Sequence, residues 1–336
     1  MYTLAKVMWF REKMPDLYRN TSSFMLFGDY ITFMLSGKAV IDYSLASRTM
    51  ALNIVDNKWD SKMLGAAGID RDLFSTLAPA GTTVGNIRPE LADELGINRN
   101  ALVVTGSHDQ VCAAVGSGIL EDGMAVNGMG TSECITPFIK SAVTGPKMLE
   151  SNFGCVPYIM EGTYVTYAFN FTGGSLLKWY RDNFAYQQVM QSKKTGESPY
   201  TILDREAFNK PTDIFVLPHF AGTGTPYMDV SAKGAILGLT FDVTPGILYK
   251  ALMEGVVYEM FYNVECLEQA GIPIKGLRAV GGGAKSDLWL QLKADIMGRK
   301  IEKLNIDEAG NLGNIMIAGI ATGVYKSYKD AAEQFD

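Results

Sequence analysis

ALVVTGSHDQVCAAVGSGILEDGMAVNGMGT, residues 101–131, is the stretch of sequence that decides the fold class, because it places one carboxylate where a strand becomes a helix. The apolar run 102–104 predicts a short strand that is closed by Gly106. The small-residue run 110–115 predicts a helix. Asp109 lies at the junction, at the carboxyl end of the strand and the beginning of the helix.

A second predicted strand, 124–127, runs directly into the glycine-rich loop 128–132. In open α/β sheets, ligands collect at the carboxyl ends of the strands, and the backbone N–H groups of such a loop can bind phosphate. Asp109 therefore has two interpretations: a functional carboxylate, or a helix N-cap, a position that aspartate favours. This segment alone leaves both open.

Length and composition indicate an ordinary globular protein of two domains. The chain has 336 residues, and its 47% hydrophobic content is enough to bury a substantial core. With 36 acidic and 30 basic side chains the formal net charge is −6, and no stripe of basic residues alternates with aromatics, so nucleic acid is not an expected partner. No apolar run approaches the roughly 18 residues that span a bilayer, and no cleavable signal pattern occurs, so we expect a cytoplasmic chain without a membrane partner.

Cysteine and histidine are too scattered to indicate a metal site or an activated nucleophile. The four cysteines lie far apart without a C-x-x-C pair, so we expect buried thiols and no structural zinc. Neither histidine is placed for a Ser-His-Asp or Cys-His arrangement. His219, which follows the predicted strand 214–217, has the context of a structural residue, whereas His108 precedes Asp109 and is expected to orient or hydrogen-bond in the same cleft.

Residues 1–100 read as mostly helical. Apolar residues repeat at helical spacing near the amino terminus, a second apolar stripe predicts a helix within 24–35 that stops at Gly37, and a further helix is predicted near 62–67. This region lacks a run of strands, so the sheet that receives strand 102–104 is expected to have few local partners.

After Gly123 the pattern changes to short strands, and we place a domain boundary there. The predicted strands are 124–127, 135–139, 155–159, 164–168, 214–217 and 235–239. A helix is predicted over 176–183, and the polar stretch 192–200 reads as a surface loop. The longest predicted helix has Thr244 as its cap and Pro245 at its first position, and it runs towards Gly271.

A second glycine-rich junction follows the predicted strand 277–280. Gly281, Gly282 and Gly283 precede the predicted helix 286–297, so a ligand could approach bare backbone at a helix N-terminus. The G-x-G-x-x-G fingerprint fails because Ser286 occupies the last glycine position, which disfavours NAD. A tight strand-to-helix turn remains the alternative. The small residues of 309–323 predict a helix that can pack closely beside this loop.

Taken together, these segments resemble the FGGY family of carbohydrate kinases, part of the actin-like ATPase superfamily. The resemblance runs through nearly the whole chain, in the expected order. It is carried by LAKVMWFREKMPDLYRNTSSFMLFGDYITFMLSG with DYSLAS at 42–47, SHDQVCAAVGSG, GMGTSE, TGGSLLKWYRDNF, GTGTPYMDVSAKGAILGLT, MEGVVYEM and VGGGAKSDLWLQLKADIMG.

The resemblance implies an α/β, ribonuclease H-like or actin-like ATPase fold, with the remainder of a sugar-binding domain over 1–122 and a nucleotide-binding domain over 123–336. It implies ATP and Mg²⁺ as cofactors, a sugar or polyol substrate, and Asp109 as the general base that accepts the hydroxyl proton. The residues implied to contact the sugar are His108, Gln110, Trp9 and Asp42, although Trp9 fits a core aromatic of an amphipathic helix better. The residues implied to contact the nucleotide are Gly130, Thr131, Ser132, Gly174, Gly281, Gly282, Gly283, Ala284, Asp287 and Asn314.

One family segment is not found in the sequence. The family normally begins with a phosphate-binding hairpin of the form D-x-G-T-[TS], and Thr82-Thr83 is no substitute because no strand and no aspartate precede it. We therefore expect a chain that enters partway through the first domain, binds nucleotide, and transfers phosphate poorly or not at all by itself. A carbohydrate kinase and a non-catalytic nucleotide- and sugar-binding module both remain open. A chaperone-like ATPase is weaker, because the SHDQ segment argues against it. The apolar helix within 24–35 is either core or the interface of a homodimer.

Overall fold

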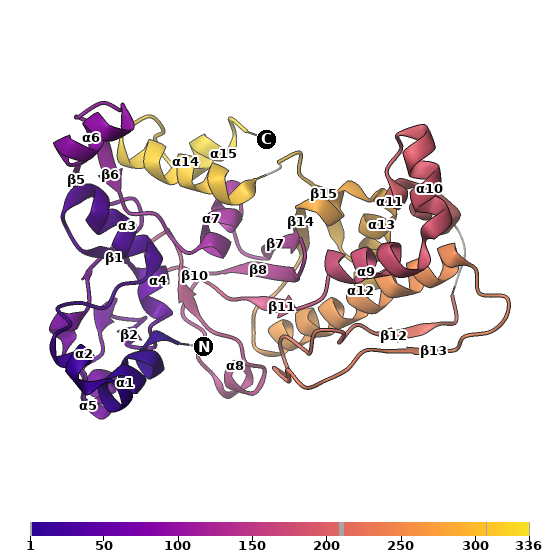
Figure 1. The fold of residues 1–336 in the computed structure, drawn as a ribbon, viewed down its shortest axis with the longest axis horizontal. Helices are drawn as coiled ribbons and strands as arrows, with labels where there is room; N and C mark the ends of the chain where they lie inside the picture. The colour runs from indigo at the N-terminus through magenta and orange to yellow at the C-terminus, as the bar shows by residue number, and fades with distance from the viewer. Residues whose placement is uncertain (1, 208–211, 307, 336) are drawn as a thin grey trace.

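The computed structural model describes residues 2–207, 212–306 and 308–335, and its central layer is a mixed β-sheet (Figure 1). The strand order is β15-β14-β7-β8-β10-β9, with β11 paired to β8 beside β10. Strands β15, β14 and β7 are parallel, and the remaining pairs are antiparallel. The strands are β7 (Met124–Met129), β8 (Glu133–Ile139), β9 (Val156–Pro157), β10 (Tyr164–Val165), β11 (Ala168–Asn170), β14 (Gly276–Val280) and β15 (Lys300–Lys303).

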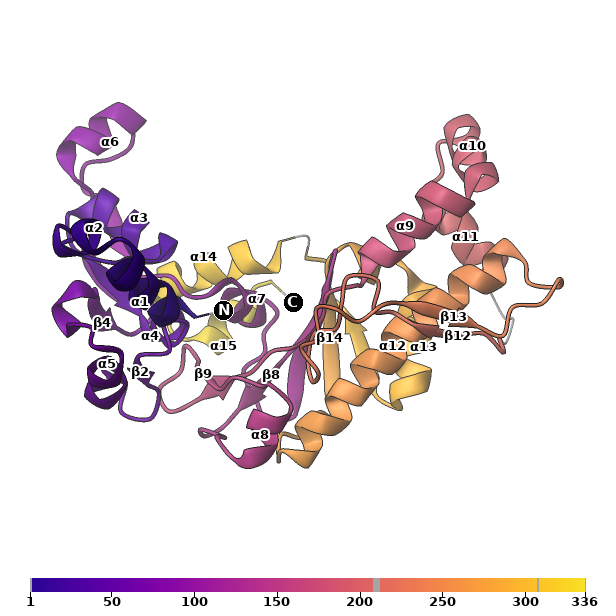
Figure 2. The same ribbon diagram turned by 60° about the horizontal axis from the view of Figure 1, so that its bottom comes forward.

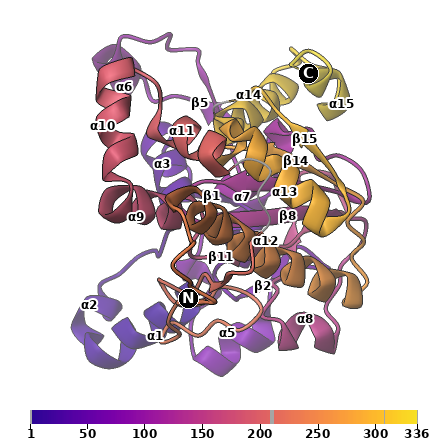
Figure 3. The same cartoon turned by 90° about the vertical axis from the view of Figure 1, so that its right-hand side faces the viewer.

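Helices cover both faces of this sheet. Along β7, Ala125 and Met129 face a core with α12 and α13, whereas Val126 faces a second core with α7 and α14. This alternation is the period-2 pattern of a strand buried on both sides. Figure 3 looks onto α12 and α13, with the strands behind them. These helices are α7 (Asp109–Gly116), α9 (Gly174–Phe184), α12 (Pro245–Gln269), α13 (Asp287–Met297), α14 (Ala309–Ala321) and α15 (Tyr328–Ala332).

The amino-terminal region is built from short helices and strand pairs. The helices are α1 (Thr3–Lys13), α2 (Pro15–Arg19), α3 (Phe27–Ser36), α4 (Tyr43–Ser47), α5 (Ser61–Ala67), the 3₁₀ turn η1 (Arg71–Leu73) and α6 (Pro89–Leu95). The strands are β1 (Val40–Asp42), β2 (Leu52–Asn53), β3 (Lys58–Trp59), β4 (Thr76–Ala78), β5 (Thr83–Asn86) and β6 (Leu102–Val104). The prediction of a region without strands was wrong, because strands of two to four residues are too short to show an alternating pattern.

Helix α3 ends at Gly37 as predicted, but its apolar stripe faces solvent. Phe27 is 88% exposed, while Asp29 and Thr32 on the opposite side are buried. The Asp29 carboxylate accepts hydrogen bonds from the backbone N–H of Leu26 at 2.8 Å and from the Ser75 hydroxyl at 2.6 Å. These bonds satisfy the buried carboxylate and hold the polar side of α3 inward. Of the predicted stripe, Phe27, Ile31 and Met34 are exposed, whereas Phe24 and Leu35 at its two ends pack against small core clusters.

The predicted strand 102–104 and the following helix are confirmed as β6 and α7. Strand β6 pairs antiparallel with β5 and does not join the central sheet. Helix α7 is the element that packs against β7 and β8. Its N-cap is His108, whose ring Nδ1 accepts from the backbone N–H of Gln110 at 3.3 Å, so Asp109 is the first helical residue and not the cap.

Helices α7 and α14 lie so close together that only glycine fits at two positions. A Cβ on Gly116 would lie 2.0 Å from the carbonyl oxygen of Ala309, and a Cβ on Gly313 would lie 1.9 Å from that of Cys112. The predicted small-residue helix is confirmed, but its partner is α7 and not the glycine loop at 281–283. Small residues predict close packing without identifying the neighbour.

The remaining elements lie around α12 and at the edges of the sheet. Helices α9, α10 and α11 form a projecting arm, and the β12–β13 hairpin packs below α12 (Figures 1 and 2). The predicted loop 192–200 is largely helical, since α10 ends at a left-handed Gly196 and α11 begins at Pro199. No helix in the described ranges is long and apolar enough to cross a membrane. These elements are α8 (Pro146–Glu150), α10 (Tyr186–Thr195), α11 (Pro199–Ala207), β12 (Phe215–Leu217), β13 (Ala235–Leu237) and the 3₁₀ turn η2 (Gly282–Lys285).

Candidate active site

Asp109 presents an accessible carboxylate at the N-terminus of α7. Its side chain is 81% exposed, and its Oδ1 accepts from the backbone N–H of Gln110 at 2.7 Å. The free N–H groups of a first helical turn favour a negative charge at this position. The Nδ1 of His108 lies 3.0 Å from the same oxygen. The carboxylate is thus held at its base by the N–H of Gln110 at the beginning of α7 while remaining open to solvent.

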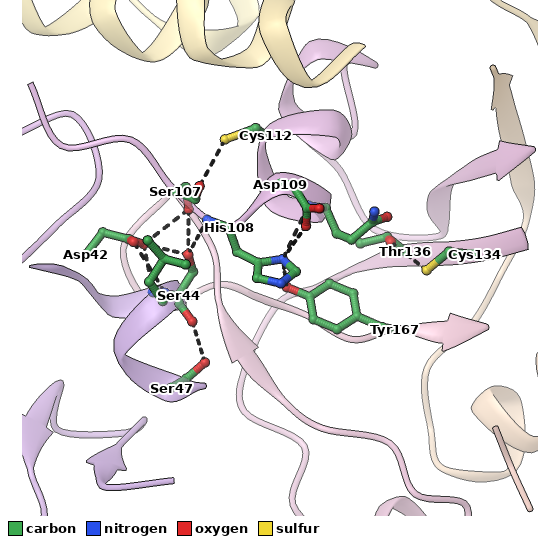
Figure 4. Close-up of polar contacts among 12 residues, drawn as sticks. Asp42, Ser44, Ser47, Ser107, His108, Asp109, Cys112, Cys134, Thr136 and Tyr167 are labelled. Carbon is green, nitrogen blue, oxygen red and sulfur yellow. Dashed lines mark hydrogen bonds and ion pairs between the residues drawn. The ribbon is translucent and has the colours of Figure 1, made fainter. Parts of the chain in front are cut away.

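His108 is held between Asp109 and Tyr167 (Figure 4). The two rings stack with centroids 5.2 Å apart, and the Tyr167 hydroxyl lies 3.2 Å from Nδ1. Burial lowers the pKa of His108, and the positive charge of Arg48 lowers it further, while the charge of Asp109 raises it. Burial also raises the pKa of Tyr167 well above its ordinary value. Both rings are therefore neutral near pH 7 and act as hydrogen-bonding supports.

Asp42 is buried and supports the turn that carries His108. Its Oδ2 accepts from the Ser44 backbone N–H at 2.8 Å and from the hydroxyls of Ser44 at 2.5 Å and Ser107 at 3.2 Å. The Ser44 hydroxyl in turn accepts from the backbone N–H of His108 at 2.8 Å. Burial raises the pKa of Asp42 to about 6, and these hydrogen bonds lower it in part. Asp42 was predicted to contact the sugar, and the structure places it beneath the turn 107–109.

A cavity of about 670 Å³ opens at the tip of the β7–β8 hairpin. The tip is closed by a hydrogen bond from the N–H of Gly130 to the carbonyl of Ser132, and the N–H of Gly174 at the beginning of α9 donates to the carbonyl of Gly130 at 2.8 Å. Residues from five segments line the cavity: Met129, Gly130, Thr131, Gly174, Ser175, Leu177, Lys178, Ser198, Tyr200, Thr201, Asp204, Tyr249, Gly282, Gly283, Lys285, Ser286 and Trp289.

Glycine is required at Gly281 because the loop 281–283 contacts the tip of the β7–β8 hairpin there. Gly281 has φ +91°, and a Cβ would lie 2.9 Å from the carbonyl oxygen of Met129. A Cβ on Gly283 would lie 2.9 Å from both Met129 and the Trp289 ring. The glycine run predicted as a ligand cradle therefore also joins the hairpin tip to the beginning of α13.

The predicted nucleotide residues separate into two groups. Gly130, Thr131, Gly174, Gly282 and Gly283 line the cavity, whereas the other predicted positions lie outside its lining. Ser132 is exposed at the hairpin tip and Ala284 is buried in the core.

Two of the residues predicted to contact the nucleotide interact with other side chains and lie outside the lining of this cavity. Asp287 is exposed and forms an ion pair with Lys303 at 2.8 Å. Asn314 is on α14, where its Oδ1 accepts from the Cys112 thiol at 3.3 Å, and it lines a separate cavity beside β6.

The sequence analysis missed the contribution of α11, whose Tyr200, Thr201 and Asp204 line the cavity. Burial raises the pKa of Asp204. The stretch 192–200, which leads into α11, was interpreted as a surface loop, so the contribution of α11 to the cavity lining was not predicted. Ser286 was predicted as the beginning of the helix 286–297 and as the residue that breaks the dinucleotide fingerprint, but not as a residue of the cavity. It is the N-cap of α13, accepting from the N–H of Trp289 at 3.1 Å, and this cap pattern was the available signal.

Of the residues predicted to contact the sugar, His108 lines a cavity of about 1100 Å³ together with Lys6, Arg48 and Tyr30. Trp9 is 52% exposed, meets Phe10 edge-on and is outside the lining of this cavity, so it is neither core nor cavity wall. Gln110 follows Asp109 in the first turn of α7.

Asp109 lies on the α7 side of the hairpin tip. Burial raises the pKa of Cys134 to about 12, and the charges of Asp109 and Glu133 raise it as well. Helix α7, which begins at Asp109, contacts β7 and β8 on the face of the sheet opposite α13. Among residues 2–207, 212–306 and 308–335, no cluster of three or more His, Cys, Asp or Glu could hold a metal ion.

Comparison with known proteins identifies related chains along almost the whole length. The model of the N-terminal domain of the FGGY family of carbohydrate kinases matches residues 1–116, and that of the C-terminal domain matches residues 125–322. Xylulose kinase from Bacillus subtilis is 28% identical over 338 residues, covering 99% of this chain and 65% of the relative. Glycerol kinase from the same organism is 31% identical over 323 residues, covering 93% of this chain and 62% of the relative.

The chain thus spans about two thirds or slightly less of the length of these curated relatives. Among solved structures, ligand-bound xylulose kinase from Lactobacillus acidophilus superposes with a TM-score of 0.88 at 23% identity, over 99% of this chain and 66% of that one. This likeness supports the fold, an α/β arrangement of the actin-like ATPase type. With both domain models matched, the chain belongs to the FGGY family of carbohydrate kinases.

Proposed function

We propose that this chain carries the catalytic carboxylate and the nucleotide site of an ATP-dependent kinase that phosphorylates a hydroxyl of a sugar or polyol. The observations that support this most directly are the exposed carboxylate of Asp109 at the beginning of α7, a helix that packs on β7 and β8, and the glycine-lined cavity at the tip of that strand pair. The sugar-side part is proposed to pass into the nucleotide-side part between residues 122 and 123. Such a kinase draws on the cytoplasmic ATP pool, so we place the activity in the cytoplasm.

Asp109 acts as the general base in the proposed reaction. It takes the proton of the substrate hydroxyl while that oxygen attacks the γ-phosphorus in line, and the bond from the γ-phosphorus to the bridging oxygen breaks to release ADP. Proton transfer of this kind typically contributes roughly 10²- to 10⁴-fold in rate. The fixed position of Asp109 in the first turn of α7, where the N–H of Gln110 donates to its carboxylate and His108 caps the helix, avoids reorganisation during the step.

The cavity residues hold the phosphates in place. The backbone N–H and hydroxyl of Thr131 and the hydroxyl of Ser175 offer donors, and Lys178 offers a positive charge at the cavity wall. Mg²⁺, when bound, neutralises charge on the phosphates. The described residues fit an ion held largely by phosphate oxygens and water, as Mg²⁺ in phosphoryl-transfer sites usually is, because they offer no cluster of three or more His, Cys, Asp or Glu that could hold it.

The alternative is a module that binds nucleotide and sugar without turnover. The same cavity and the same exposed carboxylate could also bind a nucleotide and a sugar without transferring phosphate. A coupled ADP-release assay across pentoses, hexoses and polyols separates the two. Turnover with one substrate class that is lost in Asp109→Asn supports the kinase, whereas nucleotide binding without turnover on any substrate supports the module.

We also propose a homodimer, formed through the outer face of the β12–β13 hairpin. Val216 packs inward on α12, but the outer face is apolar too, with Phe215 67% and Leu237 58% exposed and directly paired, next to Leu217 and the fully exposed Phe241. An exposed aromatic side chain presents roughly 150–250 Å², so with the leucines this face approaches the ~800 Å² per partner of a standard interface. The apolar helix α3 is the competing surface.

Sedimentation velocity tests the dimer. Phe215→Glu is expected to yield a monomer, while the matched change on the exposed face of α3, Ile31→Glu, leaves the dimer intact. A monomeric wild-type protein removes the dimer proposal. If Ile31→Glu and not Phe215→Glu yields a monomer, the dimer interface is on α3 and not on the β12–β13 hairpin.

A further inference from the structure

A lysine and a glutamate are fully buried beneath the hairpin tip, and the proposed mechanism does not use them. The Lys293 ammonium contacts Oε1 of Glu133, and both side chains are 0% exposed. The same oxygen accepts from the side-chain amide of Asn127 at 3.0 Å. The cluster lies on the α13 face of the sheet, because Glu133 pairs with Met129 across the strands and Met129 faces that core.

Stability does not account for this pair. Removing two charges from water is costly, and replacing a buried ion pair by apolar residues of similar volume is often neutral or stabilising. The cluster is also incompletely satisfied, since Glu133 Oε2, Asn127 Oδ1 and the amide nitrogen of Asn170 are buried without a hydrogen-bond partner. A loss of stability that is tolerated beside a cavity suggests that the pair has another role, which the segments that it connects can indicate.

The pair connects two of the segments that line the cavity. Glu133 is the first residue of β8, directly after the tip residues of the β7–β8 hairpin. Lys293 is one helical turn beyond Trp289 on α13, and its ammonium lies 5.5 Å from the centre of the Trp289 ring. Trp289 and the N-cap residue Ser286 line the cavity beside the tip. One ion pair therefore ties the hairpin tip to the first turns of α13.

We propose that Glu133 and Lys293 are a positioning pair that fixes the spacing between the hairpin tip and the beginning of α13, so that one nucleotide contacts both segments at once. This rests on the proposed function, because it takes the cavity to be the ATP site, with the phosphates at the hairpin tip and the nucleoside beside α13. Neither Glu133 nor Lys293 lines the cavity. A nucleoside alone does not need this spacing, whereas a ligand that also carries phosphates does.

Isothermal titration with adenosine and with ADP tests this in the whole chain. The variant is Glu133→Leu with Lys293→Met, which removes both charges together and leaves no unpaired ion in the core. Gln291→Ala with Asp295→Ala is the matched control, a hydrogen-bonded pair on the exposed side of the same helix. The positioning role predicts adenosine affinity within about twofold of wild type and ADP affinity roughly 10- to 100-fold weaker, the equivalent of one charge-assisted hydrogen bond, with the control unchanged for both ligands.

Each outcome has a separate meaning. Wild-type protein that binds neither ligand refutes the proposed function, and the positioning role with it. Wild-type binding with an unchanged ratio of ADP to adenosine affinity in the double variant refutes the positioning role alone, as does an equal loss of both ligands. Should the apolar pair fail to fold, Glu133→Gln with Lys293→Met retains the Asn127 contact, and the same ratio decides.

Discussion

Replacing Gly313 by alanine tests the close contact between α14 and the helix that carries Asp109. The added Cβ would lie 1.9 Å from the carbonyl oxygen of Cys112 and 2.7 Å from its carbonyl carbon. Both are backbone atoms, so no change of side-chain rotamer can relieve the clash. Since real Cβ contacts are essentially never shorter than 3.0 Å, the two helices must separate by about 1 Å. A packed interface transmits such a displacement to its neighbours.

Two opposing effects set the size of the change. Overpacking of a filled interior costs typically about 1–3 kcal/mol, while alanine is favoured over glycine in a helix interior by about 1 kcal/mol. Because the clash is with backbone, we take the upper part of the first range and expect a net loss of about 2 kcal/mol. The control is Gly310→Ala on the same helix, where the nearest atom to the new Cβ is 3.9 Å away, so stability should be unchanged or slightly higher.

Urea unfolding, followed by fluorescence and fitted with a common slope, measures both variants. A Gly313→Ala protein that is as stable as wild type, or as stable as the Gly310→Ala control, would refute the close approach of α7 and α14. A loss shared equally by both variants would point to a general intolerance of α14 to larger residues and would equally contradict the reasoning.

Three other predictions follow from the site. Asp109→Asn should lower turnover by roughly 10²- to 10⁴-fold in the ADP-release assay without changing the unfolding midpoint, because the side chain is exposed; unchanged turnover would exclude it as the base. Burial raises the pKa of Asp42 from 3.8 to about 6. The protonated acid therefore stabilises the fold below about pH 4, and this contribution to the free energy of unfolding, about 3 kcal/mol, is lost as the pH rises through about 6. If the difference in unfolding free energy between wild type and Asp42→Asn does not vary over pH 4–7, this prediction is wrong. Lys178→Ala should weaken ADP binding by roughly 3- to 10-fold at low salt, with a smaller effect at high salt, and equal affinities in titration calorimetry would remove Lys178 from the phosphate site.

Signals that are local in sequence predicted the elements well. Thr244 and Pro245 define the beginning of α12, whose cap hydroxyl accepts from the N–H of Ile247, and Ser286 marks the beginning of α13. The strands at 102–104 and 135–139 were predicted within two residues of their ends. Such signals are local because caps, turns and alternation act over a few residues.

Pairings between distant segments could not be predicted in the same way. Helix α14 was placed beside the glycine loop because its small residues indicate close packing but not the partner, which is α7. Glu133 and Lys293 are separated by 160 positions, and neither has a pattern around it that distinguishes it from a surface charge. The wall that α11 contributes was missed because a glycine and a proline near 196–199 read as loop, although they end one helix and begin the next.

The hydrogen bonds from Asp42 through Ser44 to the 107–109 turn have a consequence for protein engineering. The turn that carries Asp109 is hydrogen-bonded to a segment 65 positions earlier in the chain, in which the Asp42 side chain is itself buried. Chimaeras that exchange the SHDQ segment between related kinases, but keep the host's earlier segment, would combine two halves of one hydrogen-bonded unit. Recombination with both segments from one parent preserves that unit, and crossover points between residues 48 and 106 break it.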